Sequence, residues 1–453
     1  MLDFALLSMP HPHHSPEPKM TAAIILTFMR QFSGGLLQLG IVFMIARVLG
    51  EEGLGDYAII ALMPVLISQT LSLGLTVSIT YFVSARIFSL QEAYRITRDV
   101  LLALAALGML CTWLVLELFS EVIFPNIEPR LLFLVILALP FTLINMGMMA
   151  FFQALEDFKS FNKLSIAPPF ITFGIVGSAL FFGYLNLAVA SAALVAGHVA
   201  GSFVGICLVS SHTSILGKSP ERYAYLKQAL PYGFKAYVAN LTAFLTYRID
   251  LLLVNFFLGA ASTGLYVAAI RMVEQLWLIS QAVSTVILPR LASMVDDEEE
   301  SRHLAPLIAR YVLWVTGVSA ILVALFADFL LEVLFGVPFK AAASVLHILL
   351  PGIVVFSVAR IISNALAARG KVSINLCISF GVLVGNAILN YIFIPRYGME
   401  GAATATFATY TIATIAFLLV GSRVMKVNIF SFLSPQSGDV KLIQNFFGRR
   451  KGQ

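Results

Sequence analysis

Charged residues and cysteines are both scarce in this sequence. Only 12% of the 453 residues are charged, whereas 59% are hydrophobic. Water-soluble domains carry about 25% charged residues, so a chain of this composition is an integral membrane protein. The three cysteines, Cys111, Cys207 and Cys377, each lie alone in an apolar run. This spacing excludes a disulfide framework and a cysteine-based metal site, and we interpret the cysteines as core residues.

Long polar stretches are missing as well, which excludes a sizeable aqueous domain on either side of the membrane. A membrane-spanning helix needs about 20 mostly apolar residues. Twelve runs meet this requirement, at residues 22–47, 57–83, 99–119, 131–153, 162–182, 187–210, 231–257, 264–289, 304–334, 341–367, 372–394 and 399–422. The sequence therefore predicts an all-α, polytopic membrane protein with 12 transmembrane helices.

The positive charges are distributed unequally between the two sides of these predicted helices. With a cytoplasmic N-terminus, 19 lysines and arginines fall on the cytoplasmic side and four fall on the opposite side, namely Arg47, Arg130, Lys340 and Arg396. Lysine and arginine accumulate in cytoplasmic loops, so we expect both termini to be cytoplasmic. The net charge of +5 is therefore a topology signal and does not indicate nucleic-acid binding.

The two ends of the chain are expected to lie outside the membrane. Residues 1–20 hold an apolar stretch too short for a secretory signal, followed by a Pro/His cluster, and we expect a disordered extension there. Translation from Met1 and from Met20 are both compatible with this interpretation. Residues 425–453 form a basic cytoplasmic tail, which we expect to contact anionic membrane lipids.

A short turn sequence occurs twice along the chain. Leu49, Gly50, Gly55 and Tyr57 recur as Leu258, Gly259, Gly264 and Tyr266, at a constant offset of 209 residues. Each repeat contains six predicted helices, an even number, so both copies have the same orientation in the membrane. We expect two pseudo-symmetric six-helix bundles, at 21–211 and 231–424, joined by a cytoplasmic linker at 212–230. Bundles related in this way rock against each other around a central cleft in many transporters.

Several segments carry a family resemblance. The stretch IARVLGEEGLGDYAII at 45–60 resembles the signature of the polysaccharide transport family, the Wzx-type flippases of the multidrug/oligosaccharidyl-lipid/polysaccharide exporter superfamily. The segments at 154–163, 248–266, 365–375 and 394–406 are similar to further motifs of that family. This resemblance implies transfer of a polyprenyl-pyrophosphate-linked oligosaccharide from the cytoplasmic to the periplasmic leaflet of the bacterial inner membrane. The glycan would be an O-antigen, capsule or exopolysaccharide repeat unit.

Ionisable side chains within the predicted spans are the candidate functional residues, because charge inside a membrane is costly and seldom incidental. Arginines bind phosphate groups well, so a cationic cleft is expected to bind the substrate. The residues that we assign to it are Arg30, Arg248, Arg271, Arg360, Gln38 and Asn386. Simpler interpretations stay open: Arg271 and Glu274 form a helical ion pair, Arg360 extends to the membrane surface, and Asn386 only links helices.

Two further roles are assigned from the same pattern. Asp250 and Glu274 are candidates for coupling transport to a proton or Na⁺, and no other cofactor or metal is expected. Pro140 and Pro351 occupy equivalent positions in the two repeats and are candidate hinges. Other membrane proteins of polysaccharide assembly are candidate partners.

Two other functions compete with the flippase. A cation-coupled exporter of small drugs would have the same fold, but cationic drugs favour an acidic site, whereas the candidate site here has four arginines. A membrane glycan polymerase or glycosyltransferase needs polar loops for its catalytic groups, and the predicted outer loops are a few residues long. We therefore expect a transporter and not an enzyme.

Overall fold

The computed structural model describes residues 17–123, 127–212, 222–293 and 298–434, and every element in these ranges is helical. The fold class predicted from the sequence, an all-α membrane protein, is therefore confirmed. The elements are α1 (Glu17–Leu71), α2 (Leu75–Ser84), α3 (Leu90–Ile123), α4 (Pro129–Ala154), α5 (Phe158–Phe181), α6 (Leu187–Ser210), α7 (Arg222–Thr246), α8 (Ile249–Ser293), α9 (Glu298–Leu325), α10 (Ala327–Phe335), η1 (Val337–Ala342), α11 (Ala343–Ala368), α12 (Val372–Met425) and η2 (Ile429–Phe432).

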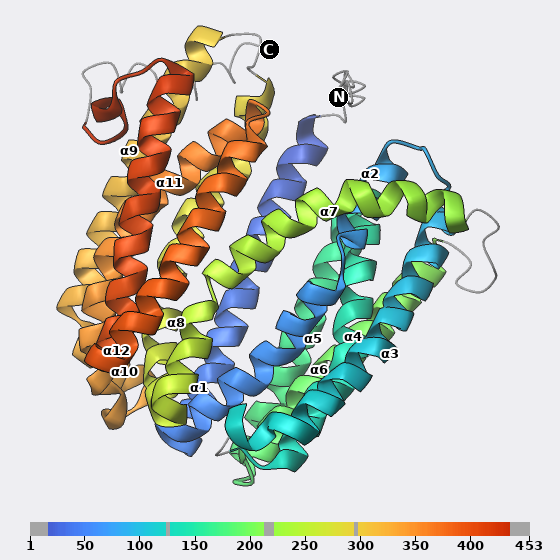
Figure 1. Ribbon diagram of the computed structural model, residues 1–453, viewed down its shortest axis with the longest axis vertical. Helices are drawn as coiled ribbons and strands as arrows, with labels where there is room; N and C mark the ends of the chain where they lie inside the picture. Colours follow the sequence, from blue (N-terminus) through green and yellow to red (C-terminus); the bar gives the residue numbers. More distant parts are fainter. Residues whose placement is uncertain (1–16, 124–126, 213–221, 294–297, 435–453) are drawn as a thin grey trace.

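Nine helices in the described ranges are long and apolar enough to cross a membrane. Three of them, α1, α8 and α12, bend at a single glycine with non-helical backbone angles, at Gly50, Gly259 and Gly398. In Figure 1 these bends lie at the end of the molecule opposite to the start of α1. Each bent helix consists of two helical segments that meet at its glycine, and the count of twelve spans stays a prediction.

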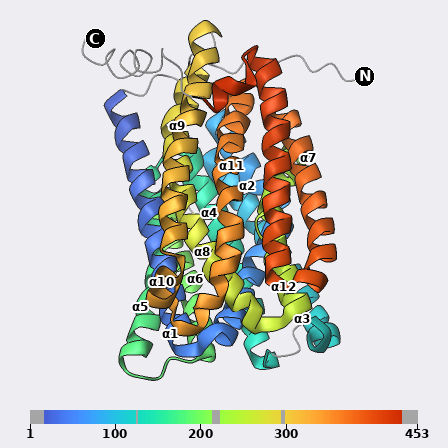
Figure 2. The ribbon, with the colours of Figure 1, turned by 90° about the vertical axis from the view of Figure 1, so that its left-hand side faces the viewer.

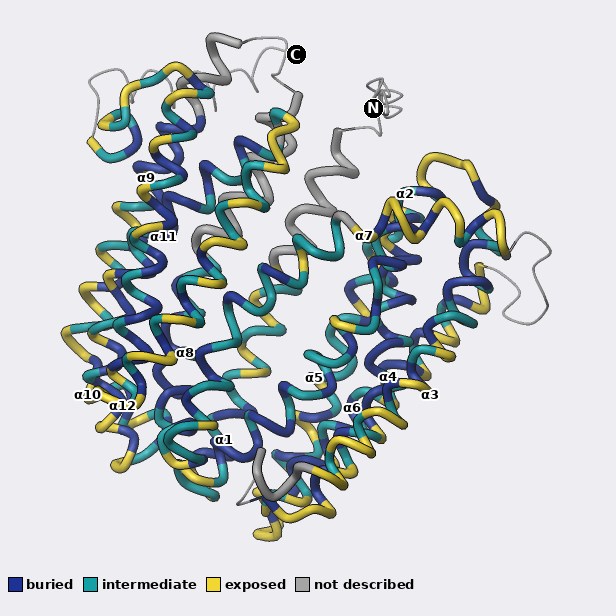
Figure 3. The backbone as a smooth tube through the Cα atoms, viewed as in Figure 1, coloured by how far each residue is buried: buried dark blue, intermediate teal, exposed yellow. Residues whose placement is uncertain are grey.

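The helices form two groups that follow the chain order. Figure 1 shows α3–α6 on one side and α9–α12 on the other, with α1, α7 and α8 between them. In the first group α5 and α4 pack against α6, and in the second α11 packs against α9 and α12, as Figure 2 also shows. Exposed residues lie along the outward sides of both groups (Figure 3). The exposed residues include large apolar ones, such as Trp113 of α3 and Trp314 of α9. Apolar surfaces of this extent are suited to contact with lipid.

The two copies of the repeated turn meet each other at what we call the glycine seam, formed by Glu51, Gly55, Ala260 and Gly264. A Cβ atom on Gly55 would lie 1.9 Å from the carbonyl oxygen of Ala260, and one on Gly264 would lie 1.9 Å from that of Glu51. The two contacts are reciprocal, since Ala260 and Gly264 follow Glu51 and Gly55 by 209 residues. Only glycine allows backbones to approach this closely. The duplicated turn therefore closes one end of the molecule.

The backbone angles explain why the duplicated turn has glycine at equivalent positions and could be recognised in the sequence. Gly50 has φ 68° and ψ −166°, and Gly259 has φ 79° and ψ −172°. Side chains other than glycine are strongly disfavoured at such positive φ values. The same residue type at the same offset thus produces the same bend in α1 and α8, and each bend brings its following glycine to the seam.

The segment predicted as a linker contains the start of a helix. α7 begins at Arg222, and its first half packs on the first group of helices. The Ser78 hydroxyl donates to the Ala229 carbonyl at 2.6 Å, and the rings of Tyr81 and Tyr232 stack 4.2 Å apart. Residues 213–221 of this linker, and residues 1–16 of the predicted extension, lie outside the described ranges. α7 therefore physically joins the two groups.

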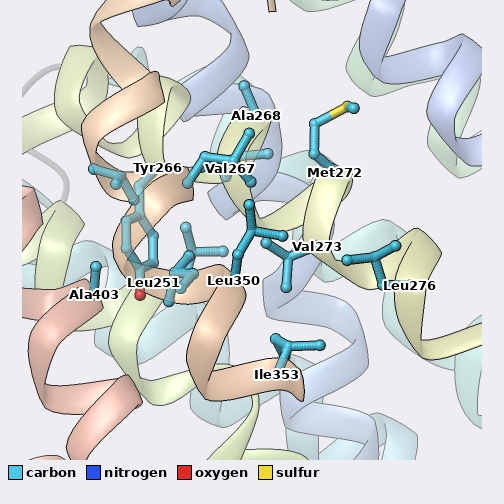
Figure 4. Close-up of a cluster of buried hydrophobic side chains, with 14 of the residues drawn as sticks. Leu251, Tyr266, Val267, Ala268, Met272, Val273, Leu276, Leu350, Ile353 and Ala403 are labelled. Atoms are coloured by element: carbon cyan, nitrogen blue, oxygen red, sulfur yellow. The ribbon is translucent and has the colours of Figure 1, made fainter. Parts of the chain in front are cut away.

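The core of the second group is continuous from α8 to α11 and α12. Figure 4 shows Tyr266, Val273 and Leu276 of α8 among Leu350 and Ile353 of α11, with Ala403 of α12 beside Tyr266. These side chains are buried. This packing fixes α8, and with it the charged residues on the opposite side of the same helix.

Candidate functional site

Two adjoining cavities lie between the two groups of helices. One, the arginine cavity, has a volume of about 400 Å³ and is lined by α1, α5, α8, α11 and the junction between α7 and α8. The other, the apolar cavity, has a volume of about 320 Å³. Gln38, Pro169, Arg248 and Arg271 line both, so the two cavities are adjacent. The apolar cavity, unlike the arginine cavity, is lined by residues that follow the glycine bend of α1, and it therefore lies nearer the seam. They include Leu54, Tyr57, Ala58, Ala61 and Leu62.

The four candidate arginines all line the arginine cavity. Arg30, on α1, donates from Nη1 to the Ser165 hydroxyl at 2.7 Å, and its guanidinium lies 5.3 Å from the centre of the Phe161 ring. Arg360, on α11, lies over the Trp277 ring at 5.2 Å. Cation–π contacts of this kind hold a guanidinium in place without neutralising its charge.

Arg248 reaches the cavity because the helix breaks beside it. α7 ends at Thr246 and α8 begins at Ile249, and the two intervening residues, Tyr247 and Arg248, both line the arginine cavity. The amide of Arg248 is bonded to the Leu245 carbonyl at 3.0 Å, which forms a tight turn. The sequence predicted one uninterrupted span at 231–257. The break directs Arg248 to the cavity and Asp250 to the core of the second group.

One carboxylate joins two of these arginines. Glu274 Oε1 accepts from Arg248 Nη1 at 2.9 Å, and Glu274 Oε2 accepts from Arg271 Nη1 at 2.7 Å. The helical pair of Arg271 and Glu274 is therefore present, as the sequence suggested. The contact with Arg248 was not expected, because 26 residues separate it from Glu274 along the chain.

Several guanidinium nitrogens in the cavity are buried without a hydrogen-bond acceptor. Within the described residues, Arg30 Nε, Arg271 Nε and Arg360 Nη1 have no hydrogen-bond partner. A buried charged donor without an acceptor costs several kcal/mol unless a ligand or water satisfies it. Arginine donates two parallel hydrogen bonds to phosphate groups. The arrangement is therefore suited to binding an anion with several oxygen atoms.

Asp250 and Asn386 line neither the arginine cavity nor the apolar cavity. The Asp250 carboxylate is buried and accepts a hydrogen bond from the Tyr266 hydroxyl at 2.7 Å. Asn386 is fully buried in α12 and donates to Thr409 at 3.1 Å and to Thr406 at 3.4 Å. Its amide is thus used in helix packing, which agrees with the simpler interpretation of that residue, and substrate binding by Asn386 stays a prediction.

Pro140 and Pro351 line neither cavity. Pro140 lies within α4 and Pro351 within α11, where it is exposed. A hinge function for this pair stays a prediction.

Other residues of the arginine cavity were not singled out from the sequence. Ser165, Tyr247, Gln275 and Trp277 line it beside the arginines. Gln275 could have been identified, since it lies four residues after Arg271 and so on the same side of the helix. The aromatic residues carry no comparable signal, because tyrosine and tryptophan are common in membrane helices for other reasons.

Two solved structures with a similar fold are described as a flippase and as a transporter. The chain is similar to the lipid II flippase MurJ in an inward closed conformation, with a TM-score of 0.74, 15% identity and coverage of 95% of this chain and 93% of that one. It is also similar to an inward-facing multidrug resistance MATE family transporter of the MOP superfamily, with a TM-score of 0.68, 14% identity and coverage of 87% and 94%. At these identities the likeness establishes the fold.

Relatives detected by sequence carry names from polysaccharide assembly. The "Putative O-antigen transporter" of Shigella flexneri is 25% identical over 79% of this chain and 87% of its own length. The "Probable low-salt glycan biosynthesis flippase Agl15" of Haloferax volcanii is 27% identical over 49% of this chain, and the match spans about half of that relative, 48% of its length. The family described as "Polysaccharide biosynthesis protein" matches residues 42–344, which is well over half of the chain, and the chain therefore belongs to this family.

Proposed function

We propose that this protein is a flippase that moves a polyprenyl-pyrophosphate-linked oligosaccharide from the cytoplasmic to the periplasmic leaflet of a bacterial inner membrane. The coarser statement, a multi-pass membrane transporter of polysaccharide biosynthesis and not an enzyme, follows from the family and from the relatives. The observation that carries the proposal is the convergence of four arginines on one cavity, with three of their nitrogens buried and without an acceptor among the described residues.

The charge of the cavity decides what kind of cargo it accepts. Four arginines and one glutamate line the arginine cavity, so it is strongly cationic. A diphosphate carries negative charge on oxygen atoms that accept paired hydrogen bonds from guanidinium groups. Amide groups such as that of Gln38 can replace the water around sugar hydroxyls, while the polyprenyl chain stays in the lipid. A cationic drug would be repelled from the same cavity, which argues against the drug exporter.

The orientation of the molecule in the membrane is part of this proposal. With both termini in the cytoplasm, the glycine seam lies on the periplasmic side and closes it, because the described chain begins and ends at the opposite end (Figure 1). The bound substrate would then leave when the seam separates. Rocking of the two groups of helices supplies that motion in the alternating-access mechanism.

We also propose that Asp250 couples this motion to a proton or Na⁺. Its carboxylate is buried in the second group, apart from the cavity, and is bonded to Tyr266. Entry of a cation there would compensate a charge that is costly to bury. Glu274 is a weaker candidate for this role, because its two oxygens are already occupied by arginines.

The coupling role makes a prediction for two variants. Asp250→Asn and Asp250→Ala are both expected to lose transport driven by an ion gradient, because neither can exchange a proton or hold a cation. Binding of undecaprenyl diphosphate to the purified variants should stay within about threefold of wild type, a shift of less than 1 kcal/mol. The measurement is transport into proteoliposomes with and without a proton or Na⁺ gradient. Undiminished gradient-driven transport by Asp250→Asn would assign the coupling to another group.

The proposed function itself is tested by deleting the gene. The deletion strain is expected to accumulate lipid-linked oligosaccharide in the cytoplasmic leaflet, and a plasmid copy of the gene should restore its delivery. Leaflet distribution is measured by access of an external glycosidase or lectin, and the sugars of the accumulated lipid are then analysed. Normal delivery in the deletion strain, with no redundant transporter present, would refute the proposal.

A further inference from the structure

Glu274 is the single acidic residue among the described residues that line the arginine cavity. It lies between two arginines that come from different parts of the chain, one at the junction of α7 and α8 and one on α8. Each carboxylate oxygen accepts one hydrogen bond, from Arg248 at 2.9 Å and from Arg271 at 2.7 Å. All three side chains are partly accessible from the cavity, with exposed fractions of 19% for Glu274 and 25% for each arginine.

The geometry of this contact resembles the way in which arginines hold a phosphate. Two guanidinium groups approach two oxygen atoms of one anionic group from different sides, and both bonds are short. A phosphate of the substrate would offer the same oxygen atoms to the same donors. Like charges within a few ångströms disfavour each other, so the carboxylate and a bound phosphate cannot both keep these donors at full strength.

We propose that Glu274 is an internal competitor of the substrate. Its carboxylate occupies Arg248 and Arg271 in the empty cavity, gives them up to the diphosphate of the lipid-linked substrate, and takes them back when that substrate leaves. The inference rests on the proposed function. In it Glu274 is a positioning residue, which acts through the two arginines and sets how readily the anion is released. Arg30 and Arg360 contact a hydroxyl and aromatic rings, and no described carboxylate competes for them.

This role has a physical rationale in both states of the cavity. Without Glu274, the empty cavity would bury four cations with no counter-charge, which is strongly destabilising. With all four arginines available, a diphosphate would bind tightly and leave slowly, because differences in affinity between related complexes arise mostly in the dissociation rate. A tethered carboxylate reduces both effects.

The test is the affinity of the purified full-length protein for undecaprenyl diphosphate. Glu274→Gln keeps the shape of the side chain and removes its charge, and it is expected to lower the dissociation constant by about tenfold or more, equivalent to at least about 1.4 kcal/mol. Export of glycan in cells is expected to fall in the same variant, because release becomes slow. An unchanged or higher dissociation constant would overturn the inference and leave Glu274 as a residue that merely orients the arginines.

A charge-balanced variant guards against a folding defect in Glu274→Gln. Arg248→Gln combined with Glu274→Gln removes one charge of each sign, and its affinity is compared with that of Arg248→Gln alone. If Glu274 competes with the substrate, adding Glu274→Gln to Arg248→Gln should tighten binding of undecaprenyl diphosphate. If Glu274 only orients the arginines, the added substitution should not tighten it. If wild-type protein and every variant fail to bind undecaprenyl diphosphate, the proposed function fails. If wild type binds and the glutamine variants do not tighten, only the inference fails.

Discussion

Replacing Gly55 by alanine is expected to open the periplasmic side of the protein and to abolish export. The new Cβ atom would lie 1.9 Å from the carbonyl oxygen of Ala260, and a backbone atom cannot move aside as a side chain can. Overpacking of this kind costs about 1–3 kcal/mol, and it acts only in the state in which the seam is closed. That state would therefore lose roughly 5- to 150-fold in population relative to the open one. Gly264→Ala is expected to behave alike, because its Cβ atom meets Glu51 in the same way.

Accessibility of the apolar cavity from outside the cell measures this effect. Ala58 lines that cavity, so Ala58→Cys in a background without the three native cysteines is a suitable reporter. A membrane-impermeant maleimide should label it faster when Gly55 is alanine. The matched control is Gly174→Ala on α5, where a Cβ atom would meet nothing within 4 Å. Equal labelling with Gly55→Ala and with the control would show that the glycine seam is not the periplasmic closure.

Neutralising three arginines of the cavity is the second change with a large expected effect. The triple variant Arg30→Gln, Arg248→Gln, Arg271→Gln should lose measurable binding of undecaprenyl diphosphate and lose export. Each hydrogen bond to a charged group contributes about 1.5 kcal/mol or more, so the three together correspond to at least about a thousandfold in affinity. Binding to purified protein and glycan export in cells are the two measurements.

Folding and general charge effects are separated by two further variants. Arg130 lies in the first turn of α4 with its side chain 90% exposed, so Arg130→Gln removes a positive charge without touching the cavity and should export normally. Arg30→Gln with Arg360→Gln leaves the contacts of Glu274 intact and should still weaken binding by about two orders of magnitude. Export at the wild-type level by the triple variant would remove the cationic cavity as the substrate site.

The arginines of the cavity could be selected from the sequence because charge within an apolar run is conspicuous. Arg30, Arg248, Arg271 and Arg360 were chosen on that basis, and the structure brings all four to one cavity. The same reasoning selected Asn386, which the structure places outside the cavity, because an amide also satisfies itself against threonines of a neighbouring helical segment. Polarity alone does not distinguish a cavity from a helix interface.

Contacts between segments that are far apart along the chain could not be predicted from the sequence. Arg248 meets Glu274 only because the chain reverses at Gly259 and α7 breaks before Ile249. The repeat predicted the reversal at Gly259. The break before Ile249 was not predicted, because the residues around the break are ordinary helix formers. The docking of α7 on α2 was missed for a related reason: residues 222–230 are polar enough to pass for a loop.

The reciprocal contact at the seam is the kind that two identical subunits make across a two-fold axis. Yet the arginine cavity has no such symmetry. The positions equivalent to Arg248, Arg271 and Glu274 in the first repeat are Leu39, Leu62 and Val65, and the position equivalent to Arg30 in the second is Ala239. A homodimer of one half would carry every charge twice or not at all. Joining both halves in a single polypeptide lets the seam remain symmetric while the two halves contribute differently charged walls to the arginine cavity.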